Sequence, residues 1–218
     1  MSSLTTTVEA GFSTPPPSRN TANNRVELAF WIGLLVLANL GLLIGNSPSI
    51  DLTFRPQAVA AGEWWRIFIS PFVHVSRYHL LMDGTAFLLV YAGLEERRWS
   101  RRLALALCSA AGSLLLPLAI APELNQIGLC GLSGAAHGLT AVSALEMLRH
   151  RQQRKVGGVL LVALLSKTAW EMWSGTVFLQ FLHFGDIGQP IVATHAGGVL
   201  GGVAGFLLIG LVGKTLKG

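Results

Sequence analysis

Charged residues are scarce in this chain of 218 residues. Asp, Glu, Lys and Arg together make up 12% of the sequence, whereas 51% of it is hydrophobic. Soluble domains usually carry about 25% charged residues. The composition therefore argues against a soluble protein and indicates a membrane protein.

Cysteine is scarce as well, with Cys108 and Cys130 as the two in the sequence. We expect Cys108 near the cytoplasmic start of the third apolar run and Cys130 near the opposite face of the membrane. The third helix rises about 1.5 Å per residue, so a disulfide between them is not expected. A signal peptide is not expected either. The first apolar run is too long for a signal sequence and lacks a small-residue cleavage site.

Two sequence patterns that are absent argue against particular classes of protein, namely metalloenzymes and small transporters. No HExxH motif accompanies His74, His79 and Asp83, which could each bind a metal, so we expect no metal and no cofactor; loss of activity on chelation would contradict this. No internal repeat is apparent, which argues against a small transporter. The formal net charge of +5 is explained by membrane orientation, so no nucleic-acid partner is expected.

Six mostly apolar runs predict an all-α polytopic membrane protein with a six-helix bundle. The second and fourth runs are short and polar at one end, as expected for helices that border a water-filled cavity. Residues 1–24 are polar with a proline run, so we expect a disordered cytoplasmic tail, followed by a membrane domain over residues 25–218. The runs cover roughly residues 26–44, 79–94, 103–121, 132–148, 156–174 and 191–212.

Basic residues gather in alternate connections, and short cytoplasmic loops are rich in Lys and Arg. The opposite loops hold only Arg55, Arg66 and Arg77. Both termini are therefore expected to be cytoplasmic. The basic residues on the expected cytoplasmic side are Arg19, Arg25, Arg97, Arg98, Arg101, Arg102, Arg149, Arg151, Arg154, Lys155, Lys214 and Lys217.

Polar groups that lipid would penalise fall in the segments "WWRIFISPFVHVSRYHLLMDG", "GLSGAAHG" and "THAGGVLGG". With the expected topology, Ser133, His79, Asp83 and His195 converge near the extracytoplasmic end of the bundle. A serine between glycines is often only a helix cap or a small packing residue. His195, by contrast, begins a glycine-rich helix face that lets a neighbouring helix approach closely, so its ring is pressed against that helix. A serine such as Ser133 needs a base of this kind nearby to become a nucleophile.

These motifs resemble, in order and spacing, the rhomboid intramembrane serine proteases over about residues 63–212. They are Trp65-Arg66, His74, His79, Gly131-Leu132-Ser133-Gly134, and His195 with its following glycines. Within rhomboids the chain looks most like the rhombosortase branch, because of His137 and the pair Lys167 and Glu171.

The resemblance implies a Ser–His dyad without a third carboxylate, in which Ser133 attacks a peptide carbonyl and His195 is the general base. It also implies an oxyanion hole made by the Ser133 backbone N–H and the His79 side chain, and a substrate pocket near Gly131 and His137. Most rhomboids have Asn where this sequence has Asp83. An ionised carboxylate there would repel the oxyanion, so Asp83 is either protonated or holds His79 in position.

Several alternatives stay open at this point. His137 lies one helical turn after Ser133 and could compete as the base, and Cys130 could replace Ser133 as the nucleophile. Lys167 and Glu171, spaced i to i+4, fit a structural ion pair better than a substrate contact. The chain could also be a rhomboid-like pseudoprotease that binds transmembrane segments without cutting them.

The rhombosortase resemblance implies a function. We expect an intramembrane serine endopeptidase of the bacterial inner membrane, surrounded by lipid, with its active site open to the periplasmic side. Its substrates would be secreted proteins with C-terminal membrane-anchoring tails of the GlyGly-CTERM type. A general rhomboid protease with other transmembrane substrates is the alternative.

Overall fold

The structure is a computed structural model that describes residues 21–215, and the side chains of residues 24–211. Within that range every regular element is a helix, apart from one isolated antiparallel bridge between Phe54 and Leu129. Six long helices follow the six apolar runs: α1 Thr21–Ala38, α5 Arg77–Gly93, α6 Trp99–Ile120, α8 Ser133–Arg149, α9 Arg154–Ser174 and α10 Ala193–Thr215. The short helices are α2 Leu40–Gly45, η1 Ile50–Leu52, α3 Pro56–Ala60, α4 Arg66–Ile69, η2 Ser70–Phe72, α7 Leu124–Ile127 and η3 Gln180–Leu182.

Three helices are long and apolar enough to cross a membrane: α6, α9 and the Ala193–Leu211 part of α10. Helices α5 and α8 have 17 residues each and carry the polar residues of the expected cavity. The six-span count therefore stays a prediction for α1, α5 and α8. Residues 1–20 of the expected tail lie outside the described residues, and α1 begins inside that expected tail, at Thr21.

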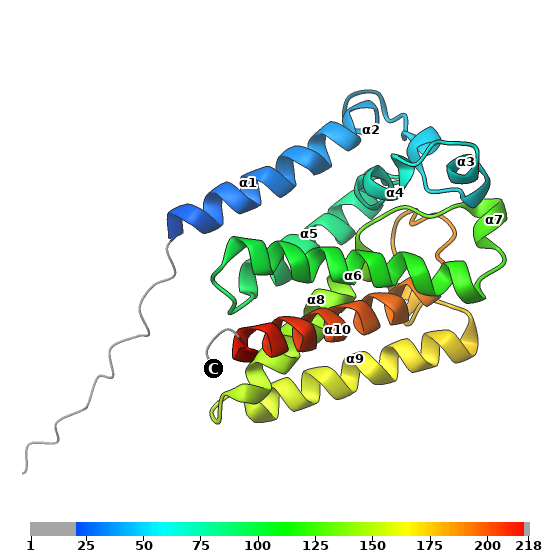
Figure 1. Cartoon of the computed structure of the whole chain (residues 1–218). Coiled ribbons are helices and arrows are strands. Elements are labelled where there is room, and N and C mark those ends of the chain that lie inside the picture. Colours follow the sequence, from blue (N-terminus) through cyan, green and yellow to red (C-terminus); the bar gives the residue numbers. More distant parts are fainter. Residues whose placement is uncertain (1–20, 216–218) are drawn as a thin grey trace, which may run out of the picture.

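The long helices alternate in direction, so their connections fall at two opposite ends of the bundle (Figure 1). The start of α1, the α5–α6 and α8–α9 connections and the end of α10 share one end. That end carries the basic residues that favour the cytoplasmic side, from Arg25 to Lys155; Arg19, Lys214 and Lys217 lie outside the described side chains. The starts of α5, α8 and α10 share the opposite end.

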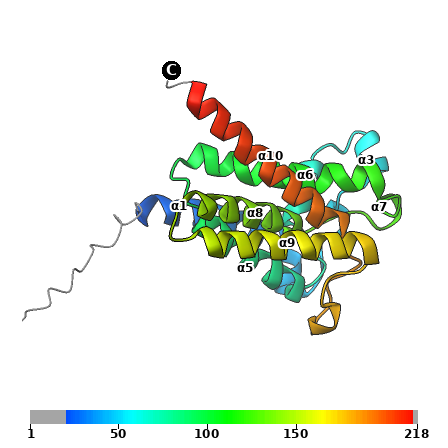
Figure 2. The same cartoon turned by 90° about the horizontal axis from the view of Figure 1, so that it is seen from below.

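Helix α10 packs closely against α6 and α8 because of its glycines (Figure 2). A Cβ at Gly197 or Gly201 would overlap backbone atoms of α6, and a Cβ at Gly198 or Gly202 would overlap carbonyl oxygens of α8. The sequence predicted one bare glycine face on this helix. The structure confirms the close approach and shows that the glycines serve two neighbouring helices.

A buried asparagine connects the first helix to the segment that precedes α5. Asn39 lies between α1 and α2, and its amide donates to the carbonyls of Leu35 and Phe72, at 2.8 and 2.7 Å. Its Oδ1 accepts the backbone N–H of His74 at 3.0 Å. Ser76 then caps α5 by accepting the N–H of His79 at 3.0 Å. These bonds fix where His74 and His79 enter the site.

Candidate active site

Ser133 is the first residue of α8, and the turn before it requires glycine. Gly131 has a φ of +98°, a conformation that side chains disfavour. A Cβ there would lie 2.7 Å from Asp83 Oδ2 and 3.0 Å from His79 Nε2. Leu132 occupies the N-cap position of α8 and Ser133 is the first residue of the helix itself, so Ser133 is not an ordinary helix cap.

His195 lies in the first turn of α10, opposite the start of α8. Its Nε2 is 3.2 Å from Ser133 Oγ, within the distance at which a base can take a hydroxyl proton. The His195 residue is only 6% exposed. The close packing of α10 on α8 thus brings together the two residues that the sequence singled out, although 62 positions separate them.

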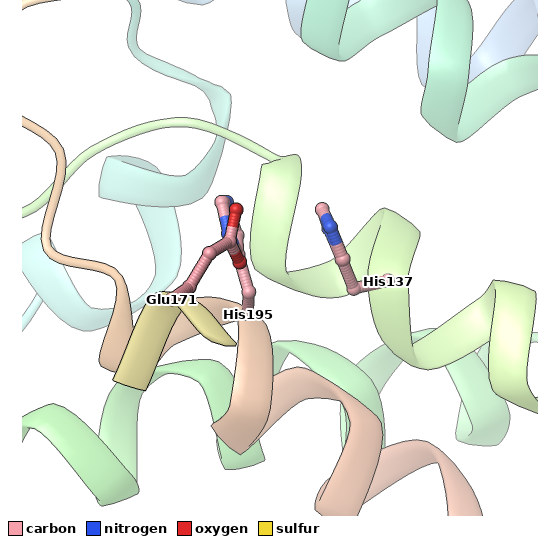
Figure 3. Close-up of side chains that lie close together, drawn as sticks. All are labelled: His137, Glu171 and His195. Carbon is pink, nitrogen blue, oxygen red and sulfur yellow. The ribbon is translucent and has the colours of Figure 1, made fainter. Parts of the chain in front are cut away.

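Glu171 of α9 stands behind His195. Its Oε2 lies 2.8 Å from His195 Nδ1, and the residue is fully buried. Its Oε1 accepts the backbone N–H of Phe178 at 2.9 Å. The resemblance implied a dyad with no third carboxylate, and here a buried carboxylate does contact the histidine. Figure 3 shows Glu171 and His195 side by side, with His137 across from them on α8.

Lys167 joins this group through its ammonium. Its Nζ lies 2.6 Å from Glu171 Oε1, 2.8 Å from His137 Nε2 and 3.5 Å from His195 Nδ1. The expected ion pair between Lys167 and Glu171 is therefore present, but it also contacts both histidines. The ligand atoms of His137, Glu171 and His195 lie within 4.8 Å of one another, close enough to hold a metal. The lysine ammonium contacts all three, so it supplies the cation there.

His137 cannot act as the base in this arrangement. Its Nδ1 lies 2.7 Å from the carbonyl oxygen of Ser133, so Nδ1 carries the proton and Nε2 accepts from Lys167. Neither ring nitrogen faces the serine hydroxyl. The ring instead stacks on His195, with centroids 4.0 Å apart and planes 12° apart. His137 thus supports the His195 ring from α8.

The expected oxyanion-hole groups converge on Asp83. The backbone N–H of Ser133 donates to Asp83 Oδ2 at 3.0 Å, and His79 Nε2 lies 3.1 Å from the same oxygen. His74 Nε2 is 3.7 Å away. Burial lowers the pKa of His74 to about 4, which keeps its ring neutral. Asp83 therefore contacts His79, which is one of the two arrangements that the sequence left open, and its carboxylate engages both groups expected to bind an oxyanion.

A cavity of about 320 Å³ opens beside these residues, and Ser133, His79, Asp83 and His195 all line it. The expected convergence at one end of the bundle is confirmed. Neither Gly131 nor His137 is among the lining residues, so their expected contact with substrate stays a prediction. Apolar side chains form much of the remaining wall: Ile50, Val75, Met82, Ile127, Leu129, Val177, Ile187, Pro190 and Ile191.

Cys130 lines the same cavity as a free thiol, and Cys108 is free as well, as expected from their positions. Burial, together with the nearby Asp83 carboxylate, raises the pKa of the Cys130 thiol to about 12. A thiol that stays protonated is a poor nucleophile. Among the described residues no base is hydrogen-bonded to it, so the geometry favours Ser133 over Cys130.

A match to a known protein family identifies the family of this chain. The model of the Rhomboid domain matches residues 61–211, which is more than half of the chain. The chain belongs to the rhomboid family. No curated protein and no solved structure gave a match.

Rhomboids are intramembrane serine proteases. The matched region runs from α4 into α10 and contains every residue of the candidate site, whereas α1 and Asn39 precede it. The sequence alone does not identify two groups of this rhomboid that hold the site residues in place, Glu171 and Asn39. The spacing of Glu171 predicts only a local pair with Lys167, and Asn39 lies inside the first apolar run, residues 26–44, which the structure divides into α1 and α2. An ionisable residue inside a membrane-spanning segment is a functional candidate by default, and this is the feature of the sequence that points to Glu171.

Proposed function

We propose that this protein is an intramembrane serine endopeptidase in which Ser133 is the nucleophile and His195 the general base. The observation that carries the proposal is the 3.2 Å distance between Ser133 Oγ and His195 Nε2 at the wall of a cavity. His195 takes the hydroxyl proton as Ser133 attacks the peptide carbonyl, and returns it to the leaving amine. Water then hydrolyses the acyl-enzyme.

The oxyanion that forms in this reaction needs hydrogen-bond donors. The Ser133 N–H and His79 Nε2 are the nearest candidates, and both contact Asp83 Oδ2. We propose that the Asp83 carboxylate moves away from these two donors when substrate binds. The two donors are then released toward the oxyanion.

For the substrate we propose C-terminal membrane-anchoring tails of the GlyGly-CTERM type, as in the rhombosortase branch. A cavity of about 320 Å³ with largely apolar walls fits a short unwound segment with small side chains. Glycine costs about 1 kcal/mol relative to alanine in a helix, so a transmembrane segment unwinds most easily there. Paired glycines would bring a bare peptide bond to Ser133.

We propose a multi-pass location in the bacterial inner membrane, with six spans, cytoplasmic termini and a cavity open to the periplasm. The asymmetry of basic residues between the two ends of the bundle supports this orientation. Membrane lipid and tail-anchored substrates are the proposed partners.

The substrate proposal is tested in cells with a secreted reporter that carries such a tail. Processing should require this protein and should fall strongly when the paired glycines are replaced by leucines. Undiminished cleavage of the leucine reporter would favour a general rhomboid protease with other substrates. If the reporter stays uncut but co-purifies with the protein, the non-catalytic alternative is favoured.

A further inference from the structure

We infer that Glu171 is a positioning residue that orients His195 for proton transfer, and that Lys167 tunes this interaction from the same helix. The inference deepens the proposed function and rests on Ser133 and His195 acting as nucleophile and base. It assigns a third group to a site in which the family resemblance implied only two.

The hydrogen bond to Glu171 fixes the tautomer of His195. A carboxylate only accepts, so the imidazole nitrogen that faces it at 2.8 Å, Nδ1, must carry a proton. In the neutral ring Nε2 is then unprotonated and faces Ser133 Oγ at 3.2 Å. This is the tautomer that a general base requires. When Nε2 takes the serine proton, the resulting imidazolium faces an anion.

Glu171 is itself held in place on both oxygens. Oε2 contacts His195, while Oε1 accepts from Lys167 Nζ at 2.6 Å and from the Phe178 N–H at 2.9 Å. The Phe178 contact is possible because α9 ends at Ser174 and the next residue, Gly175, has a φ of +69° that turns the chain back toward the helix. A fully buried carboxylate with these partners cannot rotate without losing hydrogen bonds, so the orientation of His195 is fixed as well.

Lys167 lies one helical turn before Glu171 and supplies the charge that a buried carboxylate needs. Its side chain is 27% exposed, whereas that of Glu171 is fully buried. Two opposite charges thus lie close to His195, and they act on its protonation in opposite directions. Glu171 favours the imidazolium, and Lys167 opposes it.

The other groups around His195 are neutral or more distant. From α8 it meets the Ser133 hydroxyl and the stacked ring of His137, whose nitrogens are occupied by Ser133 O and Lys167. His79 and Asp83 of α5 and His183 of the α9–α10 connection line the same cavity. The hydrogen bonds of Lys167 and Glu171 in the described part of the chain involve none of these three side chains, so the effect of those two charges can be isolated.

The test measures the rate at which a fluorophosphonate probe labels Ser133 in the full-length protein, from pH 5 to pH 9. Labelling needs the nucleophile and its base but no identified substrate. Glu171→Gln removes the anion, so the plateau rate should fall by about 100-fold or more. The pH of half-maximal labelling should move downward, because the imidazolium has lost its partner while Lys167 remains.

Lys167→Met should move the half-maximal pH in the opposite direction, upward. Glu171→Gln combined with Lys167→Met should return it toward the wild-type value.

The matched control is Glu146→Gln, which removes another buried carboxylate. Glu146 lies at the far end of α8, where it accepts hydrogen bonds from the backbone N–H groups of Glu95 and Glu96. The control substitution should leave the half-maximal pH unchanged. If Glu171 only stabilised the fold, Glu171→Gln would lower the fraction of protein that is labelled. The half-maximal pH would then not shift in opposite directions in the Glu171 and Lys167 variants.

Glu171→Asp provides a second variant if Glu171→Gln does not fold, because it retains a carboxylate and should label faster than Glu171→Ala. Wild-type labelling rates in Glu171→Gln, or shifts of the same sign in the Glu171 and Lys167 variants, would overturn the inference. Failure of the proposed function looks different. In that case the wild-type protein would be labelled no faster than Ser133→Ala.

Discussion

Replacement of Gly198 by alanine tests whether the close contact of α10 with α8 positions the catalytic pair. A Cβ at Gly198 would overlap the carbonyl oxygen of Gly134, one residue after Ser133. Gly198 also follows His195 by three residues, so the overlap lies within one turn of both reactive groups. The helices must separate by roughly 1 Å to relieve it, and such a misplacement costs about 100-fold in rate.

The same helix offers a matched control. A Cβ at Gly210 meets only the Arg149 guanidinium, at 3.6 Å, which is ordinary van der Waals contact. Both substitutions gain about 1 kcal/mol of helix propensity, but only Gly198→Ala pays for overpacking, at about 1–3 kcal/mol. The difference between the two variants therefore isolates the packing effect.

The assay combines fluorophosphonate labelling of Ser133 with thermal unfolding in detergent. Gly210→Ala should label like the wild type and unfold at the same or a slightly higher temperature. Gly198→Ala should label about 100-fold more slowly, even well below its unfolding temperature. If Gly198→Ala labels at the wild-type rate, the contact between α8 and α10 does not set the distance between Ser133 and His195.

Three further predictions concern the site and the topology. Ser133→Ala and His195→Ala should each abolish reporter cleavage in membranes, and the double variant should be no worse, because the two residues act as a unit; additive losses would contradict this. Asp83→Asn should keep a substantial fraction of activity, because the amide oxygen can still accept from the two oxyanion-hole donors without the negative charge that opposes the oxyanion; a loss of about 1,000-fold, or roughly 4 kcal/mol, would show that the carboxylate itself is required. A single cysteine at Asn125 should react with an impermeant reagent outside intact cells and one at Gln153 should not; the reverse pattern would overturn the orientation.

Much of the helical framework could be predicted from the sequence. Helices α6, α9 and α10 contain apolar runs, and the glycine spacing of α10 predicted a close neighbour. Ser133 and His195 were recognisable because polar and ionisable side chains are costly inside a membrane and are usually functional there. Apolar periodicity, however, does not specify which helices meet, and so the second neighbour of the glycine face appeared only in the structure.

The role of Glu171 could not be predicted for a related reason. Its i to i+4 spacing from Lys167 already gave it a local partner, so nothing in the sequence required a contact with His195, 24 residues away. The contact depends on how α9 packs beside α10. Asp83 was recognised as a departure from the family pattern, but its hydrogen bond with the Ser133 N–H depends on the turn at Gly131.

The most direct test of the account is the mass of the product made by purified protein in lipid vesicles from a substrate with a Gly-Gly tail. The account predicts a new C-terminus at or beside the glycine pair with the wild-type protein, and no product with Ser133→Ala. The same product from Ser133→Ala, or intact substrate after incubation with wild-type protein that folds and inserts normally, would contradict it.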